Sequence, residues 1–240
     1  MHKKEHEQLY IYPKLLRAKF INRYKRFFTD VEINGEILTV HNPNTGSMKC
    51  IVEKGRDVLI SKSDNLKRKL SHTVEAFFVD GEWVLTNTIL MNKIVGTGIR
   101  DGEIPELGNI ENIKSEYTYG DGRIDFLVDC DLGRCLIEVK NVTLFDKTHC
   151  MFPDAVTERG LKHLRLLMEA KEEGYTPCMF YICQIDRPFF KPAGHIDPKY
   201  AEALYDAVAN GLKVFTLHTV FNEDKGRVYL EKGGELTAQL

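Results

Sequence analysis

Three charged residues lie within two apolar segments of the stretch 122–142. Asp125 belongs to the first segment, and Glu138 and Lys140 belong to the second, two positions apart. Side chains two apart on a strand point to the same face, so a carboxylate and an ammonium project side by side. Charges inside apolar strands are destabilising unless they are paired or bind a metal. An ion pair near a sheet edge or a metal-dependent phosphodiesterase site would satisfy them.

In the catalytic interpretation, Asp125 and Glu138 bind a divalent cation, Mg²⁺ or Mn²⁺, and the carbonyl of Val139 completes the coordination. Lys140 would orient the attacking water or stabilise the negative charge that develops on the phosphoryl group. A Glu-x-Lys pair alone is a weak signal. An Asp, one strand-turn-strand length and then Glu-x-Lys between apolar residues is more specific.

A β-hairpin is the element that must position these side chains. The apolar runs 124–128 and 135–139 are joined by a more polar turn, 129–134, which contains Asp and Gly. Strand-type residues on both sides of such a turn predict a hairpin. Pairing of its two strands would bring Asp125 across to Glu138 and Lys140.

The hairpin resembles the PD-(D/E)xK nuclease superfamily, and the whole chain resembles the sugar fermentation stimulation protein A family. The matching segments begin near residue 20 and end near residue 200: Arg23-Tyr-Lys-Arg-Phe, His41-Asn-Pro-Asn-Thr-Gly-Ser-Met48, Ser63-Asp-Asn, Lys114-Ser-Glu, Arg123-Ile-Asp-Phe, Ile137-Glu-Val-Lys-Asn-Val-Thr143, Phe152-Pro-Asp-Ala-Val-Thr-Glu-Arg-Gly-Leu-Lys-His-Leu164 and His195-Ile-Asp-Pro-Lys-Tyr-Ala201.

The resemblance implies an OB-like barrel followed by a restriction-endonuclease-like α/β domain, DNA binding without sequence preference, and a link to the regulation of sugar use. It makes Glu116 a candidate third carboxylate, although an edge-strand residue facing solvent is an equal alternative. It also directs Arg159 and His163 towards the scissile phosphate. These two residues are four apart and share a helix face.

The N-terminal part of the chain is basic. Residues 1–72 carry 15 Lys and Arg against 8 Asp and Glu, whereas the rest carries 18 basic and 27 acidic residues, within an overall net charge of −2. Basic and aromatic residues alternate through 14–28, a pattern that suits single-stranded nucleic acid, although a solvated face is the alternative. The candidate phosphate-binding residues are Arg17, Lys19, Arg23, Lys25, Arg26, Lys67, Arg68 and Lys69.

Two domains are expected, residues 1–84 and 85–240. Short strand-like runs separated by turns predict a small all-β barrel in the first, including a run at 49–52. The second has the α/β pattern of a mixed sheet, with helices predicted from residue 86 to 95, from 152 to about 173 and from 198 to 210. Residues 9–12 form either an extra strand or a frayed end.

Other classes are excluded or left open by composition. The six cysteines form no Cys-x-x-Cys pair, and no secretory signal or run of about 18 apolar residues is present. We therefore expect a reduced, cytoplasmic protein that does not cross a membrane. The partner is predicted to be DNA, single-stranded or branched, with RNA as an alternative. A DNA-binding regulator without catalysis and a module for another ligand are the competing functions.

Overall fold

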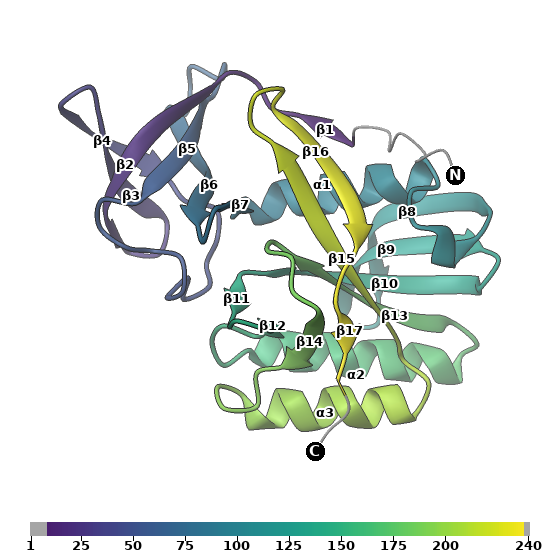
Figure 1. Cartoon of the computed structure of the whole chain (residues 1–240). Helices are drawn as coiled ribbons and strands as arrows, with labels where there is room; N and C mark the ends of the chain where they lie inside the picture. Colours follow the sequence, from purple (N-terminus) through teal and green to yellow (C-terminus); the bar gives the residue numbers. More distant parts are fainter. Residues whose placement is uncertain (1–8, 238–240) are drawn as a thin grey trace, which may run out of the picture.

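The N-terminal part of the chain forms a closed barrel in the computed structural model, which describes residues 9–237. Its sheet has the strand order β4-β3-β2-β5-β6-β7, and a parallel pairing of His41 with Thr73 joins β4 to β6. The barrel interior is filled by alternate residues such as Val31, Val40 and Phe77. The strands are β2 (Leu15–Tyr24), β3 (Phe28–Ile33), β4 (Glu36–His41), β5 (Asp57–Lys62), β6 (His72–Val79) and β7 (Glu82–Leu85). The predicted barrel is confirmed (Figure 1).

A seven-stranded mixed sheet with the order β1-β16-β15-β13-β10-β9-β8 forms the second part. The pairs β10–β13 and β13–β15 are parallel and the others are antiparallel, so the mixed sheet is confirmed. Its strands are β1 (Tyr10–Ile11), β8 (Ile110–Tyr119), β9 (Gly122–Cys130), β10 (Gly133–Val142), β13 (Thr176–Cys183), β15 (Lys213–Asn222) and β16 (Arg227–Lys232). The predicted hairpin is thus β9–β10.

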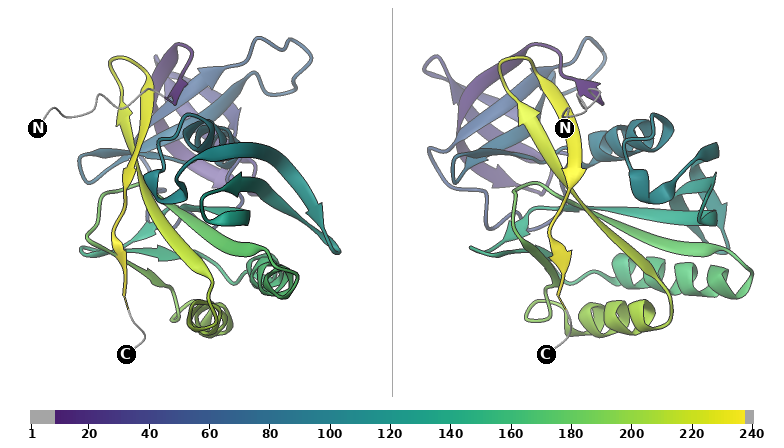
Figure 2. Two further views of the ribbon diagram at one scale, coloured as in Figure 1. Left: turned by 90° about the vertical axis from the view of Figure 1, so that its right-hand side faces the viewer. Right: turned by 45° about the vertical axis from the view of Figure 1, so that its right-hand side comes forward.

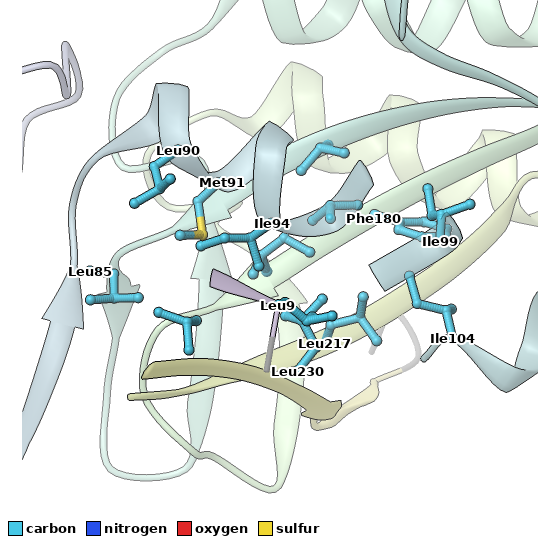
Figure 3. Packing of buried hydrophobic residues seen from close by; sticks show 14 of the residues in the cluster. Leu9, Leu85, Leu90, Met91, Ile94, Ile99, Ile104, Phe180, Leu217 and Leu230 are labelled. Carbon is cyan, nitrogen blue, oxygen red and sulfur yellow. The ribbon is translucent and has the colours of Figure 1, made fainter. Parts of the chain in front are cut away.

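Helices cover both faces of this sheet. Helix α1 (Thr88–Arg100) packs on one face, and α2 (Glu158–Glu172) and α3 (Pro198–Ala209) pack on the other (Figures 1 and 2). Figure 3 shows Leu90, Met91, Ile94 and Ile99 of α1 pointing into the apolar core between this helix and the sheet. No helix in residues 9–237 is long and apolar enough to span a membrane.

Helix α1 extends beyond the predicted end at residue 95. Its N-cap is Asn87, and the helix continues through Gly96 and Gly98 to Arg100. A Cβ on Gly96 would lie 3.0 Å from Cε1 of Phe126 in the sheet. The glycines therefore allow close packing of helix on sheet rather than ending the helix. Ile89, in the first turn of α1, is 74% exposed.

Helix α2 begins later than predicted. Phe152-Pro153-Asp154 does not start it, because Phe152–Pro153 is a cis peptide and the N-cap is Thr157, whose side chain accepts from the amide of Gly160. The end near residue 173 is confirmed, with Gly174 left-handed at φ +90°. Helix α3 is capped by Asp197, and its predicted start at residue 198 is confirmed.

Short segments account for the remaining differences. Residues 49–52 form a turn rather than a strand. Residues 144–145 and 149–152 are strands of a small second sheet, which has the order β11-β12-β14-β17. These strands are β11 (Leu144–Phe145), β12 (His149–Phe152), β14 (Phe189–Pro192) and β17 (Glu235–Leu236), and the 3-10 turn η1 (Pro105–Leu107) follows α1. Runs of two to four residues are too short to show a sequence period.

The chain crosses between the two parts twice. Tyr10 and Ile11 pair with Val228 and Arg227 in β16, so the segment before the barrel is an edge strand of the C-terminal sheet. The barrel is joined to α1 by Glu75, whose Oε2 accepts a 2.9 Å hydrogen bond from Nδ2 of the cap residue Asn87. The boundary near residue 84 stays a prediction, and residues 1–8 and 238–240 lie outside the described part.

Candidate active site

A cavity of about 790 Å³ lies where the two domains meet, and Asp125, Glu138, Val139 and Lys140 line it. These residues come from adjacent strands β9 and β10. Residues alternate between the sheet faces, so Leu136 and Glu138 lie on the face that α2 covers. The predicted catalytic residues are therefore brought together at one position in the fold.

Asp125 is held where the hairpin ladder ends. The β9–β10 pairing extends to Ile137 opposite Phe126, and the amide of Val139 then donates to Oδ2 of Asp125 at 2.8 Å. Oδ1 accepts a 2.6 Å bond from Nδ2 of Asn92 on α1. Burial, with the nearby charge of Glu138, raises the pKa of Asp125 to about 6, even though both hydrogen bonds favour the ionised form.

Glu138 is 3% exposed, and one of its oxygens contacts both Lys140 and His163. Its Oε1 accepts from Nζ of Lys140 at 2.5 Å and also contacts Nδ1 of His163, and that nitrogen lies 3.2 Å from the same Nζ. Burial opposes ionisation, but the ammonium of Lys140, followed by His163, outweighs it and lowers the pKa of Glu138. Glu138 is therefore a carboxylate at neutral pH.

The second oxygen of Glu138 is buried and has no hydrogen-bond partner among residues 9–237. A buried carboxylate oxygen without a partner is costly, and a cation would satisfy it. Within the described residues, no group of three or more His, Cys, Asp and Glu side chains has metal-binding geometry. Two carboxylates still fit Mg²⁺, which commonly takes one or two of them and completes its shell with waters and phosphate oxygens.

Glu116, the candidate third carboxylate, lies at the margin of this cavity. It stands on β8 between Ser115 and Tyr117, which pair with Phe126 and Ile124, so it faces Asp125 across the ladder. Its φ is +55°, in the left-handed region, and its carboxylate accepts a 2.8 Å bond from Nη1 of Arg123. The Glu116 side chain is 57% exposed.

Four of the candidate phosphate-binding residues are near the cavity. Arg23, Arg26 and Arg159 line it. His163 is 5% exposed and lies behind it, against Glu138 and Lys140. Arg23 uses its guanidinium internally, because it donates to the carbonyl of Gly46 at 2.8 Å and to that of Asn44 at 2.6 Å.

The other candidates do not line the cavity. Arg17 pairs with Glu223 at 2.5 Å, and Lys19 pairs with Asp57 at 2.8 Å. Arg68 donates to the hydroxyl of Thr73 at 3.0 Å. Lys25 is exposed beside Arg26, and Lys67 and Lys69 are exposed on the loop between β5 and β6.

Sequence reasoning missed Asn92 and the role of Asp154. Asn92 is a polar residue between the buried Met91 and Ile94, and that interruption of an apolar helix was the available signal. Asp154 lies at the predicted start of the helix 152–173, but its carbonyl accepts from Oγ of Ser47 at 2.7 Å and its Oδ2 accepts from the amide of Met48 at 3.0 Å. The matching motifs around residues 23, 44 and 154 therefore meet at the domain junction.

Comparison with known proteins agrees with this architecture. Residues 21–86 match the SfsA N-terminal OB domain, and residues 89–225 match the sugar fermentation stimulation protein RE domain. Sugar fermentation stimulation protein homologs from Syntrophotalea carbinolica and Geobacter metallireducens are each 43% identical, over 85% and 89% of this chain and 90% and 94% of theirs. The structure of Pyrococcus furiosus SfsA in complex with Ca²⁺ is 25% identical, with a TM-score of 0.89 over 97% of this chain and 100% of that one. The chain belongs to the sugar fermentation stimulation protein family.

Proposed function

We propose that the protein is a phosphodiesterase that depends on Mg²⁺ or Mn²⁺ and binds DNA without sequence preference. The observation that carries this proposal is the buried Oε2 of Glu138, which has no hydrogen-bond partner among residues 9–237 and belongs to a residue that lines the same cavity as Asp125 and Lys140. The Ca²⁺ complex of the related Pyrococcus furiosus protein supports a divalent cation in this family.

Different residues of the chain would bind the cation, orient the attacking water and contact the flanking phosphates. Asp125 and Glu138 would hold the cation, together with the carbonyl of Val139, and the cation would supply positive charge beside the phosphate. Lys140 donates to Glu138 at 2.5 Å and is the cation positioned to orient water or stabilise the developing negative charge. Arg26 and Arg159 line the same cavity and would contact flanking phosphates.

The elements that border the cavity favour DNA binding without sequence preference. The cavity is bordered by barrel strands, loops and the start of α1, and no helix-turn-helix pattern is evident in the sequence to read the major groove. OB-type barrels bind single strands through stacking and backbone charge, with little dependence on sequence. A role in sugar use would then act through DNA rather than through a sugar site.

A non-catalytic DNA-binding regulator is the second candidate. It is favoured by the contact of both Lys140 and His163 with one oxygen of Glu138, because such a cluster also satisfies a purely structural charge. In that case the carboxylates would stabilise the hairpin without turning over DNA.

Metal binding and cleavage by matched variants separate the two candidates. Wild type, Asp125→Asn, Glu138→Gln and the control Asp129→Asn are titrated with Mn²⁺ and Mg²⁺ and incubated with end-labelled single-stranded, duplex and branched DNA. Asp129 is also on β9 but does not line the cavity. We expect the two site variants to lose metal binding and cleavage while keeping DNA binding, with the control unchanged. DNA binding by all four proteins without cleavage of any substrate would establish the regulator instead.

A further inference from the structure

The reactive groups lie deep in a cavity of limited size. Glu138 is 3% exposed and the side chain of Lys140 is 12% exposed, so a phosphate must enter the cavity to reach them. The volume of about 790 Å³ is within the range of pockets that enclose one drug-sized molecule. Such a space accepts a few nucleotides of one flexible strand, whereas a double helix keeps its phosphates on the outside of a stiff and much wider cylinder.

One wall of the cavity belongs to the barrel and is fixed in place. Residues 44–47 form this wall, which we call the barrel loop. Arg23 donates to the carbonyls of Asn44 and Gly46, which ties the barrel loop to β2. On the other side, Ser47 Oγ lies 2.7 Å from the carbonyl oxygen of Asp154, and the next amide, that of Met48, lies 3.0 Å from Oδ2 of Asp154.

Close packing reinforces these hydrogen bonds. A Cβ on Gly46 would lie 2.6 Å from Oδ2 of Asp154, so the barrel loop and the segment before α2 are in direct contact. A third link joins the hydroxyl of Thr88, at the start of α1, to the carbonyl of Pro43 at 3.3 Å. Opening the cavity to a duplex would require breaking these contacts, which connect the barrel to both the α1 and the α2 side of the site.

Two exposed aliphatic side chains border the cavity. Ile89 on α1 is 74% exposed and Val156 on the segment before α2 is 72% exposed, and both line the cavity. Apolar side chains at such positions contact the faces of unstacked bases, as in enzymes that act on single strands or extruded nucleotides. Arg26 and Arg159 also line the cavity, and their positive charges suit the phosphates between those bases.

We propose that this site binds single-stranded nucleic acid, with the bases against Ile89 and Val156. In this proposal the barrel loop, held in place by its hydrogen bonds to Arg23 and Asp154, excludes double-stranded nucleic acid. The inference rests on the proposed function for its chemistry, but the preference for a single strand concerns binding and holds whether or not the bound strand is cut.

Binding and cleavage are therefore measured separately on one sequence. A labelled 30-nucleotide strand, its blunt duplex and a fork with one unpaired arm are titrated by fluorescence anisotropy in Ca²⁺, and are then incubated with Mn²⁺. We expect the single strand and the fork to bind at least 10-fold more tightly than the duplex, and cleavage to fall in unpaired segments. Equal affinity for duplex and single strand would overturn the inference. Preferential single-strand binding without any cleavage would support it while rejecting the nuclease proposal.

Two sets of variants test the structural cause. Asp154→Ala removes the acceptor for Met48, whereas Asp154→Asn removes the same charge but keeps a side-chain carbonyl. We expect Asp154→Ala to bring duplex affinity within about threefold of single-strand affinity and Asp154→Asn to keep the discrimination. If both variants still prefer the single strand over the duplex, the hydrogen bond between Met48 and Asp154 is not the cause of this preference. That result would overturn this part of the proposal.

The second set addresses the bases. The double variant Ile89→Ser/Val156→Ser is compared with Ile37→Ser, which changes a residue of similar exposure (71%) on β4 that does not line the cavity. We expect the double variant to bind the single strand at least fivefold more weakly, and the β4 variant to bind as wild type does. Equal single-strand affinity in all three proteins would remove the assigned role of Ile89 and Val156.

Discussion

Nδ2 of Asn92 lies 2.6 Å from Oδ1 of Asp125, so helix α1 contributes directly to the position of a carboxylate on β9. The other oxygen, Oδ2, accepts a hydrogen bond from the amide of Val139, and the two bonds together fix the orientation of the carboxylate plane. Asn92 is itself held in register by the cap of its helix, since Asn87 links α1 to Glu75 of the barrel.

Replacing Asn92 should therefore change metal affinity. Asn92→Ala removes a donor that favours the ionised form of Asp125, and we expect the apparent affinity for Mn²⁺ to fall about 10- to 100-fold, as for other residues that orient ligands. Asn92→Asp adds a third carboxylate and should strengthen binding, because affinity rises with ligand charge. Isothermal titration calorimetry measures both. Asn112→Ala is the control, since Asn112 donates to Asp129 at 3.1 Å outside the cavity. Equal affinity in wild type and Asn92→Ala would contradict the assignment.

The raised pKa of Asp125 predicts a specific pH dependence of stability. The pKa is 3.8 without perturbation and about 6 in the folded protein, so between these values the folded state binds more protons than the unfolded state. Asp125 therefore does not lower the free energy of unfolding below pH 3.8. As the pH rises to 6 and above, it lowers this free energy by about 1–3 kcal/mol.

We expect metal-free Asp125→Asn to be more stable than wild type at pH 8, and this advantage to shrink towards pH 4. Urea unfolding followed by circular dichroism at both pH values, with EDTA present, measures the difference. Metal affinity of the wild type should fall about tenfold per pH unit below 6, because the ligand must be deprotonated. A stability difference between variant and wild type that is the same at pH 4 and pH 8 would show that Asp125 does not change its protonation state in this range.

The Lys140–Glu138 contact predicts strong coupling between two variants. Lys140→Met should reduce the free energy of unfolding by about 3–5 kcal/mol, since it leaves the buried carboxylate of Glu138 with less compensation. Adding Glu138→Gln should recover a large part of that loss, because it removes the uncompensated charge. A double-mutant cycle by urea unfolding gives the coupling energy. Additive effects of the two substitutions would argue against a shared electrostatic interaction.

The two arginines Arg26 and Arg17 should differ in their contribution to DNA binding. Arg26 is exposed and lines the cavity, whereas Arg17 is paired with Glu223 and lies over the ring of Trp83. We expect Arg26→Gln to weaken binding of a 30-nucleotide strand several-fold and to reduce the salt slope by about 0.7, the value for one contact to single-stranded phosphate. Arg17→Gln should leave the slope unchanged. Fluorescence anisotropy over a series of salt concentrations checks this, and identical slopes for both variants would contradict it.

Sequence reasoning predicted the hairpin and the start of α3 because those signals are local. Asp125, Glu138 and Lys140 stand out as charges in apolar strands, and Asp197 before Pro198 predicts the start of α3. The end of α1 and the start of α2 could not be predicted in the same way. Gly96 marks close packing on the sheet rather than a helix stop, and that distinction depends on Phe126, which is distant in sequence.

The contacts of the basic residues could not be predicted from the sequence either. Arg17 and Arg23 look alike as members of one basic cluster, but their partners are Glu223 and the carbonyls of Asn44 and Gly46. Such partners lie 21 to 206 positions away, and only the folded chain brings them together. A charge pattern therefore predicts which region is basic but not which cations are available to a phosphate.

The pairing of β1 with β16 has a consequence for synthesis on the ribosome. Tyr10 leaves the ribosome early, but its partner Val228 is made more than 200 residues later. At roughly 5–20 residues per second this interval is about 10–40 s. The barrel can close during that time, because its strands are contiguous between residues 15 and 85. The edge of the C-terminal sheet must wait for the end of translation, so the nascent chain would carry a folded barrel before an assembled cavity exists.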